Sequence, residues 1–129
     1  FTGAAYLTAN QHFMTQHASG PITADDPEFL RRSKRVGTTA YNVAWGPNEY
    51  NPTGTLADYE YTDRLQYLQM PTLVTSGTDD LCTPLVAKTM VDQLPHATWT
   101  LFPRSRHMAF IDETTAYMTR LRHWLAAHD

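Results

Sequence analysis

The chain has 129 residues, of which 42% are hydrophobic and 12% aromatic, and it carries a formal net charge of −3. This composition is typical of a globular protein, and the lack of a basic stripe or of a long apolar run argues against nucleic acid and membrane as partners. The single cysteine, Cys82, excludes an internal disulfide and favours a reducing, cytoplasmic location.

The sequence of the N-terminal half predicts helices and no strand. Residues 1–17 are expected to be helical, because their apolar side chains fall near one side. A second helix is expected to begin at Pro27, with Asp26 as its N-cap, and to run to about Gly37. Residues 45–58 contain two prolines and two glycines and are expected to form a loop.

The C-terminal half predicts alternating strands and helices. Residues 72–76 and 97–102 are short apolar runs rich in β-branched or aromatic residues, which favour strands. Helices are expected over 84–93 and 113–127. The order strand, helix, strand, helix implies right-handed crossovers onto a parallel sheet. Two strands do not form a stable sheet alone, so the chain is expected to be a fragment or to pair with another polypeptide.

The sequence also predicts where each of these two helices begins and which residues of the first face the sheet. Pro84 is expected to open the first helix, and Asp112 to cap the second. In the first helix, the side chains available to face a sheet are Leu85, Val86, Met90 and Leu94.

An acid and a histidine stand in the turns after the two predicted strands. Asp80 follows the first strand, next to Asp79, and His107 follows the second, 27 residues after Asp80. In α/β-hydrolases the chain order is nucleophile, acid, histidine. No Gly-x-Ser-x-Gly motif occurs in the 129 residues, so the nucleophile is expected on other sequence. Strand-turn geometry alone does not choose between Asp79 and Asp80.

Several segments together carry a family likeness. They are Trp-Gly-Pro-Asn-Glu-Tyr at 45–50 with Gly-Thr-Leu at 54–56, Pro-Thr-Leu-Val at 71–74, Gly-Thr-Asp-Asp at 77–80 with Thr-Pro at 83–84, and Ser-Arg-His-Met at 105–108. With them the chain resembles the C-terminal portion of the proline iminopeptidase group of α/β-hydrolases. The resemblance implies an α/β fold in which residues 1–60 form a helical cap segment. Residues 61–129 then form the C-terminal part of the core, with its last two parallel strands and their helices.

The resemblance also implies roles for individual residues. The spacing of the family's motif selects Asp80 as the acid, which orients His107, and His107 acts as general base and acid. Glu49 is expected to hold the free α-amino group of the substrate. Trp45 and Tyr50 are expected to line an apolar pocket for a small ring or side chain, with plain cap packing as the alternative. Leu81 departs from the family, which often has a second glutamate there.

The sequence therefore predicts a serine hydrolase that releases N-terminal proline or another small residue from peptides. The predicted partners are an N-terminal α/β-hydrolase polypeptide carrying the serine, and a small peptide or amino-acid amide as substrate. No cofactor is implied, and no His or Cys pair has the spacing of metal ligands. The alternatives are an amino-acid amidase or an ester or lactone hydrolase on the same fold, and a non-catalytic fragment that is inactive alone.

Overall fold

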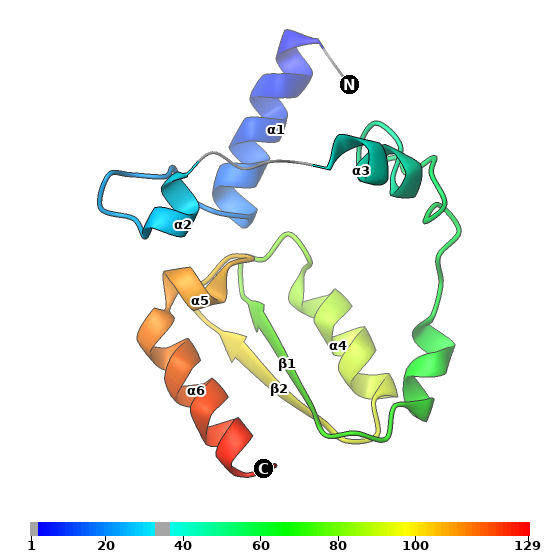
Figure 1. Cartoon of the computed structure of the whole chain (residues 1–129), viewed down its shortest axis with the longest axis vertical. Helices are drawn as coiled ribbons and strands as arrows, with labels where there is room; N and C mark the ends of the chain where they lie inside the picture. Colours follow the sequence, from blue (N-terminus) through cyan, green and yellow to red (C-terminus); the bar gives the residue numbers. More distant parts are fainter. Residues whose placement is uncertain (1–2, 33–36) are drawn as a thin grey trace.

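The N-terminal region of the computed structural model, which describes residues 3–32 and 37–129, is helical. It comprises α1 (Ala4–His17), α2 (Glu28–Arg31) and α3 (Thr38–Ala44). These helices lie beyond the ends to which the two strand arrows point (Figure 1). The helix predicted over 1–17 is present as α1, but its first two residues and residues 33–36 of the second predicted helix lie outside the described residues.

The second predicted helix differs from its prediction at both ends. Pro27, not Asp26, holds the N-cap position of α2, and the helix ends at Arg31. The Asp26 carboxylate instead accepts hydrogen bonds from the backbone N–H and the hydroxyl of Thr23, at 2.6 and 2.9 Å. This local turn uses the acceptor that an N-cap would have offered to the helix.

The C-terminal region is built on two parallel strands. A 3₁₀ helix, η1 (Thr62–Tyr67), leads into β1 (Thr72–Gly77), which is followed by α4 (Pro84–Gln93) and β2 (Ala97–Phe102). Residues of β1 pair with those of β2 in register, from Thr72 with Ala97 to Gly77 with Phe102. The predicted strands, their parallel direction and the helix between them are confirmed.

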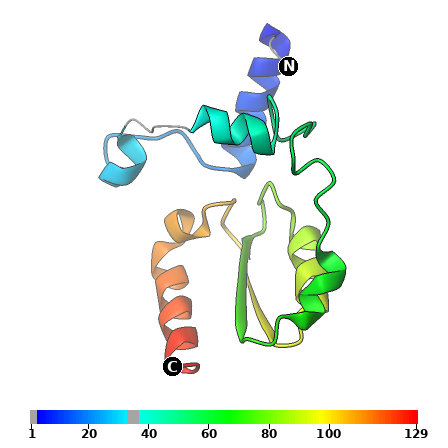
Figure 2. The ribbon, with the colours of Figure 1, turned by 45° about the vertical axis from the view of Figure 1, so that its right-hand side comes forward.

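Helices flank the strand pair on two sides. The chain ends in α5 (Ala109–Asp112) and α6 (Thr114–Ala126), and α6 and α4 lie on opposite sides of the strands (Figure 2). The helix predicted over 113–127 is confirmed as α6, and the short helix α5 before it was not predicted. Asp112 does not cap α6, because its carboxylate bonds with Arg106.

The buried side of α4 differs in part from the predicted one. Ala87 is buried, whereas Leu85 and Val86, which were expected to face the sheet, are 73% and 52% exposed. The partly buried Val91 and Leu94 follow Ala87 at positions i+4 and i+7. Of the four predicted residues, Leu94 therefore lies on the covered stripe, whereas Met90, like Leu85 and Val86, is exposed. Within the described residues, no helix is both long and apolar enough to cross a membrane.

Candidate active site

Asp80 and His107 meet at the C-terminal ends of the two strands. Nδ1 of His107 lies 2.8 Å from Oδ1 of Asp80. The Asp80 side chain is 6% exposed, whereas 47% of the His107 side chain remains exposed. A carboxylate can only accept here, so Nδ1 carries the proton and donates it. In the neutral ring, the second nitrogen, Nε2, is then the acceptor.

The turn after β1 fixes the Asp80 carboxylate. Its Oδ1 also accepts the backbone N–H of Cys82 at 2.8 Å. The neighbouring Asp79 is exposed, and its backbone N–H donates to the carbonyl of Ser105 at 3.1 Å. The structure thus directs Asp80, and not Asp79, toward His107.

The end of β1 touches the histidine turn through its backbone. A Cβ atom on Gly77 would collide with the carbonyl oxygens of Ser105 and Arg106. Glycine is therefore required here by the close approach of two backbones. This contact lets the acid turn and the histidine turn lie side by side.

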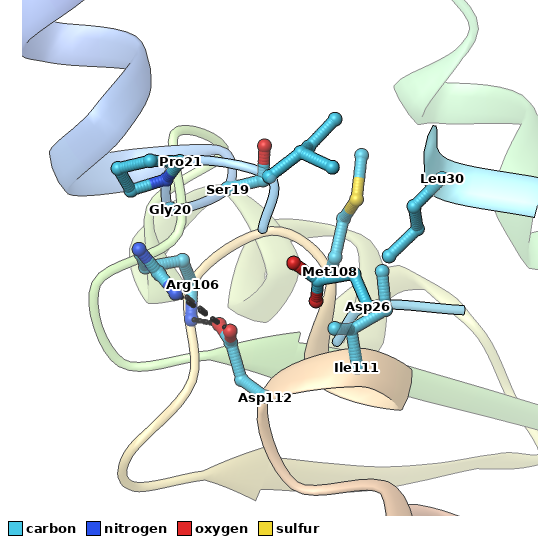
Figure 3. A pocket seen from close by; sticks show the side chains of 10 residues that line it. Ser19, Gly20, Pro21, Asp26, Leu30, Arg106, Met108, Ile111 and Asp112 are labelled. Atoms are coloured by element: carbon cyan, nitrogen blue, oxygen red, sulfur yellow. Dashed lines mark hydrogen bonds and ion pairs between the residues drawn. The ribbon is translucent and has the colours of Figure 1, made fainter. Parts of the chain in front are cut away.

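Arg106, next to His107, is held by an ion pair. Its guanidinium and backbone N–H both donate to the Asp112 carboxylate, with distances of 2.7 to 3.2 Å. Figure 3 shows this pair on one side of a cavity, with Gly20 and Pro21 near the guanidinium. Burial alone raises the pKa of Asp112, but the hydrogen bonds and charge of Arg106 outweigh it and lower that pKa below its usual value.

A hollow beside the acid contains the predicted substrate-binding glutamate. It has a volume of about 290 Å³, near the lower end of small-molecule pockets. Leu81, directly after Asp80, lines it together with Glu49 and Tyr50. Its other lining residues come from α1, α3 and the loop after α3, and are Tyr6, Asn10, Phe13, Met14, Tyr41 and Asn48.

The charge of Glu49 contributes to the pKa shifts of two neighbouring groups, Tyr41 and Cys82. Desolvation raises the pKa of Tyr41, and the charge of Glu49 and a hydrogen bond to it add to that rise. Desolvation also raises the pKa of Cys82, followed by the charges of Asp80 and Glu49. Glu49 itself is exposed, so its carboxylate is accessible to a ligand in the hollow.

The chain matches curated proline iminopeptidases over its whole length. No family model matches the chain. The chain is 99% identical over its whole length to a curated proline iminopeptidase of Lactiplantibacillus plantarum, of which it covers 45%. It is 74% identical to the proline iminopeptidase of Levilactobacillus brevis, of which it covers 43%. The crystal structure of Mycobacterium smegmatis proline iminopeptidase matches with a TM-score of 0.79 and 26% identity, over 98% of this chain and 43% of that one.

The chain has the sequence and fold of the C-terminal part of a proline iminopeptidase-like α/β-hydrolase. The predicted fold class is thereby confirmed. The chain spans less than half the length of the curated relatives it matches.

The structure brings some of the predicted site residues of this iminopeptidase-like chain together and not others. Tyr50 reaches the hollow, and its hydroxyl donates to Oδ1 of Asn10 at 2.7 Å. Trp45 is partly buried but does not line the hollow, and its backbone makes turn hydrogen bonds with Tyr41 and Thr53. Glu49 and Leu81 share the hollow beside the acid.

The sequence analysis did not single out His17 as a site residue. Its ring nitrogen Nδ1 lies 2.8 Å from the carbonyl oxygen of Asp79, 62 residues away. No local motif surrounds His17, and the contact depends on how α1 meets the strand ends. A tertiary contact of this kind leaves no signal in a single sequence.

One group of side chains in the described part of the chain could hold a metal ion. Ligand atoms of Asp80, Cys82 and His107 lie within 4.8 Å of one another. Asp80 and His107 already use facing atoms for their mutual hydrogen bond, and burial and nearby carboxylates raise the pKa of Cys82. A metal ligand thiol must lose its proton, so this environment favours the hydrogen-bonded pair over a metal.

Proposed function

We propose that this chain supplies the acid, the general base and the substrate amine site of a serine hydrolase that releases N-terminal proline or another small residue from peptides. The observation that carries the proposal is the hydrogen bond between buried Asp80 and His107, beside a hollow that contains Glu49. The printed names of the relatives support the substrate class.

The proposed reaction uses both nitrogens of His107. Nδ1 stays bonded to Asp80, while Nε2 takes the proton of the serine hydroxyl as the serine oxygen attacks the carbonyl of the N-terminal residue. His107 then gives this proton to the leaving amine, and the C–N bond breaks. Water, deprotonated by the same nitrogen, releases the acyl group and restores the serine.

The hollow supports a small N-terminal residue with a free amino group. A buried or half-buried ammonium needs an anionic partner, and Glu49 offers one. Of the described residues that line the hollow, Glu49 alone has a carboxylate. The aromatic and aliphatic lining suits an apolar ring such as that of proline.

The nucleophile is proposed to come from an N-terminal α/β-hydrolase polypeptide. A parallel sheet of two strands needs further strands for stability, and large apolar side chains of α4 and β2, such as Leu85 and Leu101, are exposed. Such surface supports packing against the rest of a hydrolase core. The same view makes residues 1–60 the cap segment and residues 61–129 the end of the core.

A second candidate is an amino-acid amidase or an ester or lactone hydrolase on this fold. Leu81 favours it, because an apolar side chain lines the hollow where a second carboxylate would strengthen the hold on an ammonium. A charge-assisted hydrogen bond contributes about 1.5–3 kcal/mol. Weaker selection for the free amine would admit other acyl donors.

The test uses the complete hydrolase, meaning this chain together with the serine-bearing polypeptide. Proline p-nitroanilide, proline amide and a p-nitrophenyl ester are compared as substrates. Asp80→Asn is expected to lower kcat about 10⁴-fold, and His107→Ala by a similar factor. His96→Ala, an exposed histidine at the other end of the sheet, is the control.

The outcomes separate the candidates. Turnover of the anilide that depends on Asp80 and His107 supports the iminopeptidase. Turnover of the amide or ester without the anilide supports the second candidate. If the complete hydrolase turns over none of the three substrates, the non-catalytic alternative holds.

A further inference from the structure

The C-terminal end of α1 rests on both turns that carry the catalytic pair. The carbonyl oxygen of His17 accepts the backbone N–H of His107 at 3.0 Å and that of Leu81 at 3.2 Å. The last four carbonyls of a helix have no partner within the helix. Here the two turns provide such partners, so one oxygen atom joins the acid turn to the histidine turn.

The side chain of His17 adds a third bond to the same place. Its Nδ1 donates to the carbonyl oxygen of Asp79 at 2.8 Å, because a carbonyl can only accept. His17 therefore holds the residue before Asp80 through its ring and the residue after Asp80 through its carbonyl. The ring is itself positioned by Phe13, with ring centroids 4.8 Å apart.

Neighbouring contacts keep this end of α1 in place. The Arg106 guanidinium donates to the carbonyl oxygen of Thr15 at 3.1 Å while it is paired with Asp112. Ala18, directly after α1, is buried. The helix end is thus held on both sides of His17. Because His17 bonds with both turns, the position of the helix end fixes the positions of the turns.

We propose that His17 is a positioning residue for the Asp80–His107 pair, which holds the acid turn through its imidazole and both turns through its carbonyl. This inference rests on the proposed function for its kinetic consequence. His17 touches no reacting atom. Without its ring, the Asp79 carbonyl loses its partner and the Asp80 carboxylate is free to shift against His107.

Two substitutions separate the donor from the ring. His17→Phe keeps an aromatic ring against Phe13 but has no donor. His17→Asn loses the ring, but its amide nitrogen can donate to Asp79 from the place of Nδ1. His12→Phe, at an exposed histidine of the same helix, is the control. All are made in the complete hydrolase, and thermal unfolding is recorded for each.

The kinetic expectation is specific to positioning. His17→Phe lowers kcat about 10- to 100-fold with little change in KM, since small misplacements of a catalytic group are costly. His17→Asn restores most of the loss, and His12→Phe has no effect. Equal losses in the Phe and Asn variants, or an unchanged kcat in His17→Phe, would overturn the proposal.

A spectroscopic readout keeps the test independent of the substrate. The signal of the proton between Nδ1 of His107 and Asp80 is followed in the downfield region of the proton NMR spectrum. It is expected to broaden or shift in His17→Phe and to persist in His17→Asn. If the wild-type hydrolase proves inactive on every substrate, the proposed function fails, but an unchanged signal in His17→Phe still decides against positioning. Should His17→Phe fail to fold, His17→Leu replaces it as the donor-free variant.

Discussion

The hydroxyl of Ser105 donates a 2.7 Å hydrogen bond to Oε2 of Glu113. Ser105 is completely buried, and the same carboxylate oxygen accepts the backbone N–H of Arg104 at 2.9 Å. Glu113 lies between α5 and α6. The Glu113 carboxylate therefore holds the histidine turn through Arg104 and Ser105, and it has no part in the proposed chemistry.

Removal of this anchor is expected to destabilise the turn. Ser105→Ala leaves the buried Glu113 carboxylate without its hydroxyl donor. We expect a lower midpoint of urea unfolding and a reduced kcat, because the next residue but one is His107. Ser76 is also buried, and its hydroxyl accepts a hydrogen bond from Nε1 of Trp99 at 3.0 Å. Because it lies within β1, Ser76→Ala is the matched control: it is expected to lower the unfolding midpoint as well but to leave kcat nearly unchanged.

Stability is expected to fall in acid through Asp112 and Glu113. Hydrogen bonds from Ser105 and from the Arg104 backbone lower the pKa of Glu113, and Arg106 lowers that of Asp112 against the effect of burial. A depressed carboxylate pKa gives stability that is full above the ordinary value and is lost as pH falls through the folded value. The loss therefore begins near the ordinary values of 4.5 and 3.8 and continues below them.

Urea unfolding measured from neutral pH to about pH 3 checks this expectation. The Asp112→Asn variant should be less stable at neutral pH, and its stability should depend less on pH in the acid range. A variant as pH-dependent as the wild type would assign the acid loss to other groups.

Gly77→Ala is expected to destabilise the protein and to displace the histidine turn. Its Cβ would meet the carbonyl oxygens of Ser105 and Arg106, which belong to the backbone and cannot rotate away. Overpacking of this kind costs about 1–3 kcal/mol. Gly3→Ala, with no atom near its Cβ, is the control, and equal stability of the two variants would contradict the close approach.

Leu81→Glu is expected to strengthen selection for a free α-amino group. The new carboxylate would enter the hollow that Glu49 lines and give an ammonium a second anionic partner, worth about a tenfold gain or more in kcat/KM for proline anilide. Leu81→Gln, of similar shape without charge, is the control. The ratio of kcat/KM for proline anilide to that for an uncharged ester measures the effect, and an equal ratio in both variants would count against an amine site here.

The strands and the strand-end turns were predictable because their signals are local. β1 and β2 are short apolar runs with clear ends, and the turns after them hold Asp80 and His107. By contrast, α3 was missed, because it begins with two β-branched threonines, which are poor helix formers. Its last carbonyls are satisfied by the loop, where the N–H groups of Thr55 and Leu56 donate to Val43 and Ala44.

Local rules misplaced two acids and gave no reason to single out His17. Asp26 and Asp112 each stand where an N-cap is expected, but their carboxylates accept hydrogen bonds from Thr23 and Arg106 instead. His17 bonds with a residue 62 positions away. Side chains whose partners come from tertiary packing are the part of the site that a single sequence does not reveal.

The parallel pairing of β1 with β2 has a practical consequence. Both site turns follow the strands at one end of the sheet, whereas the turn at Pro95 and His96 precedes β2 at the opposite end, where Thr72 pairs with Ala97. Both residues of that turn are exposed. A fluorescent label or an affinity tag inserted there would sit a full strand length from the strand-end turns, so this turn offers an attachment point for immobilising the protein with the hollow left free.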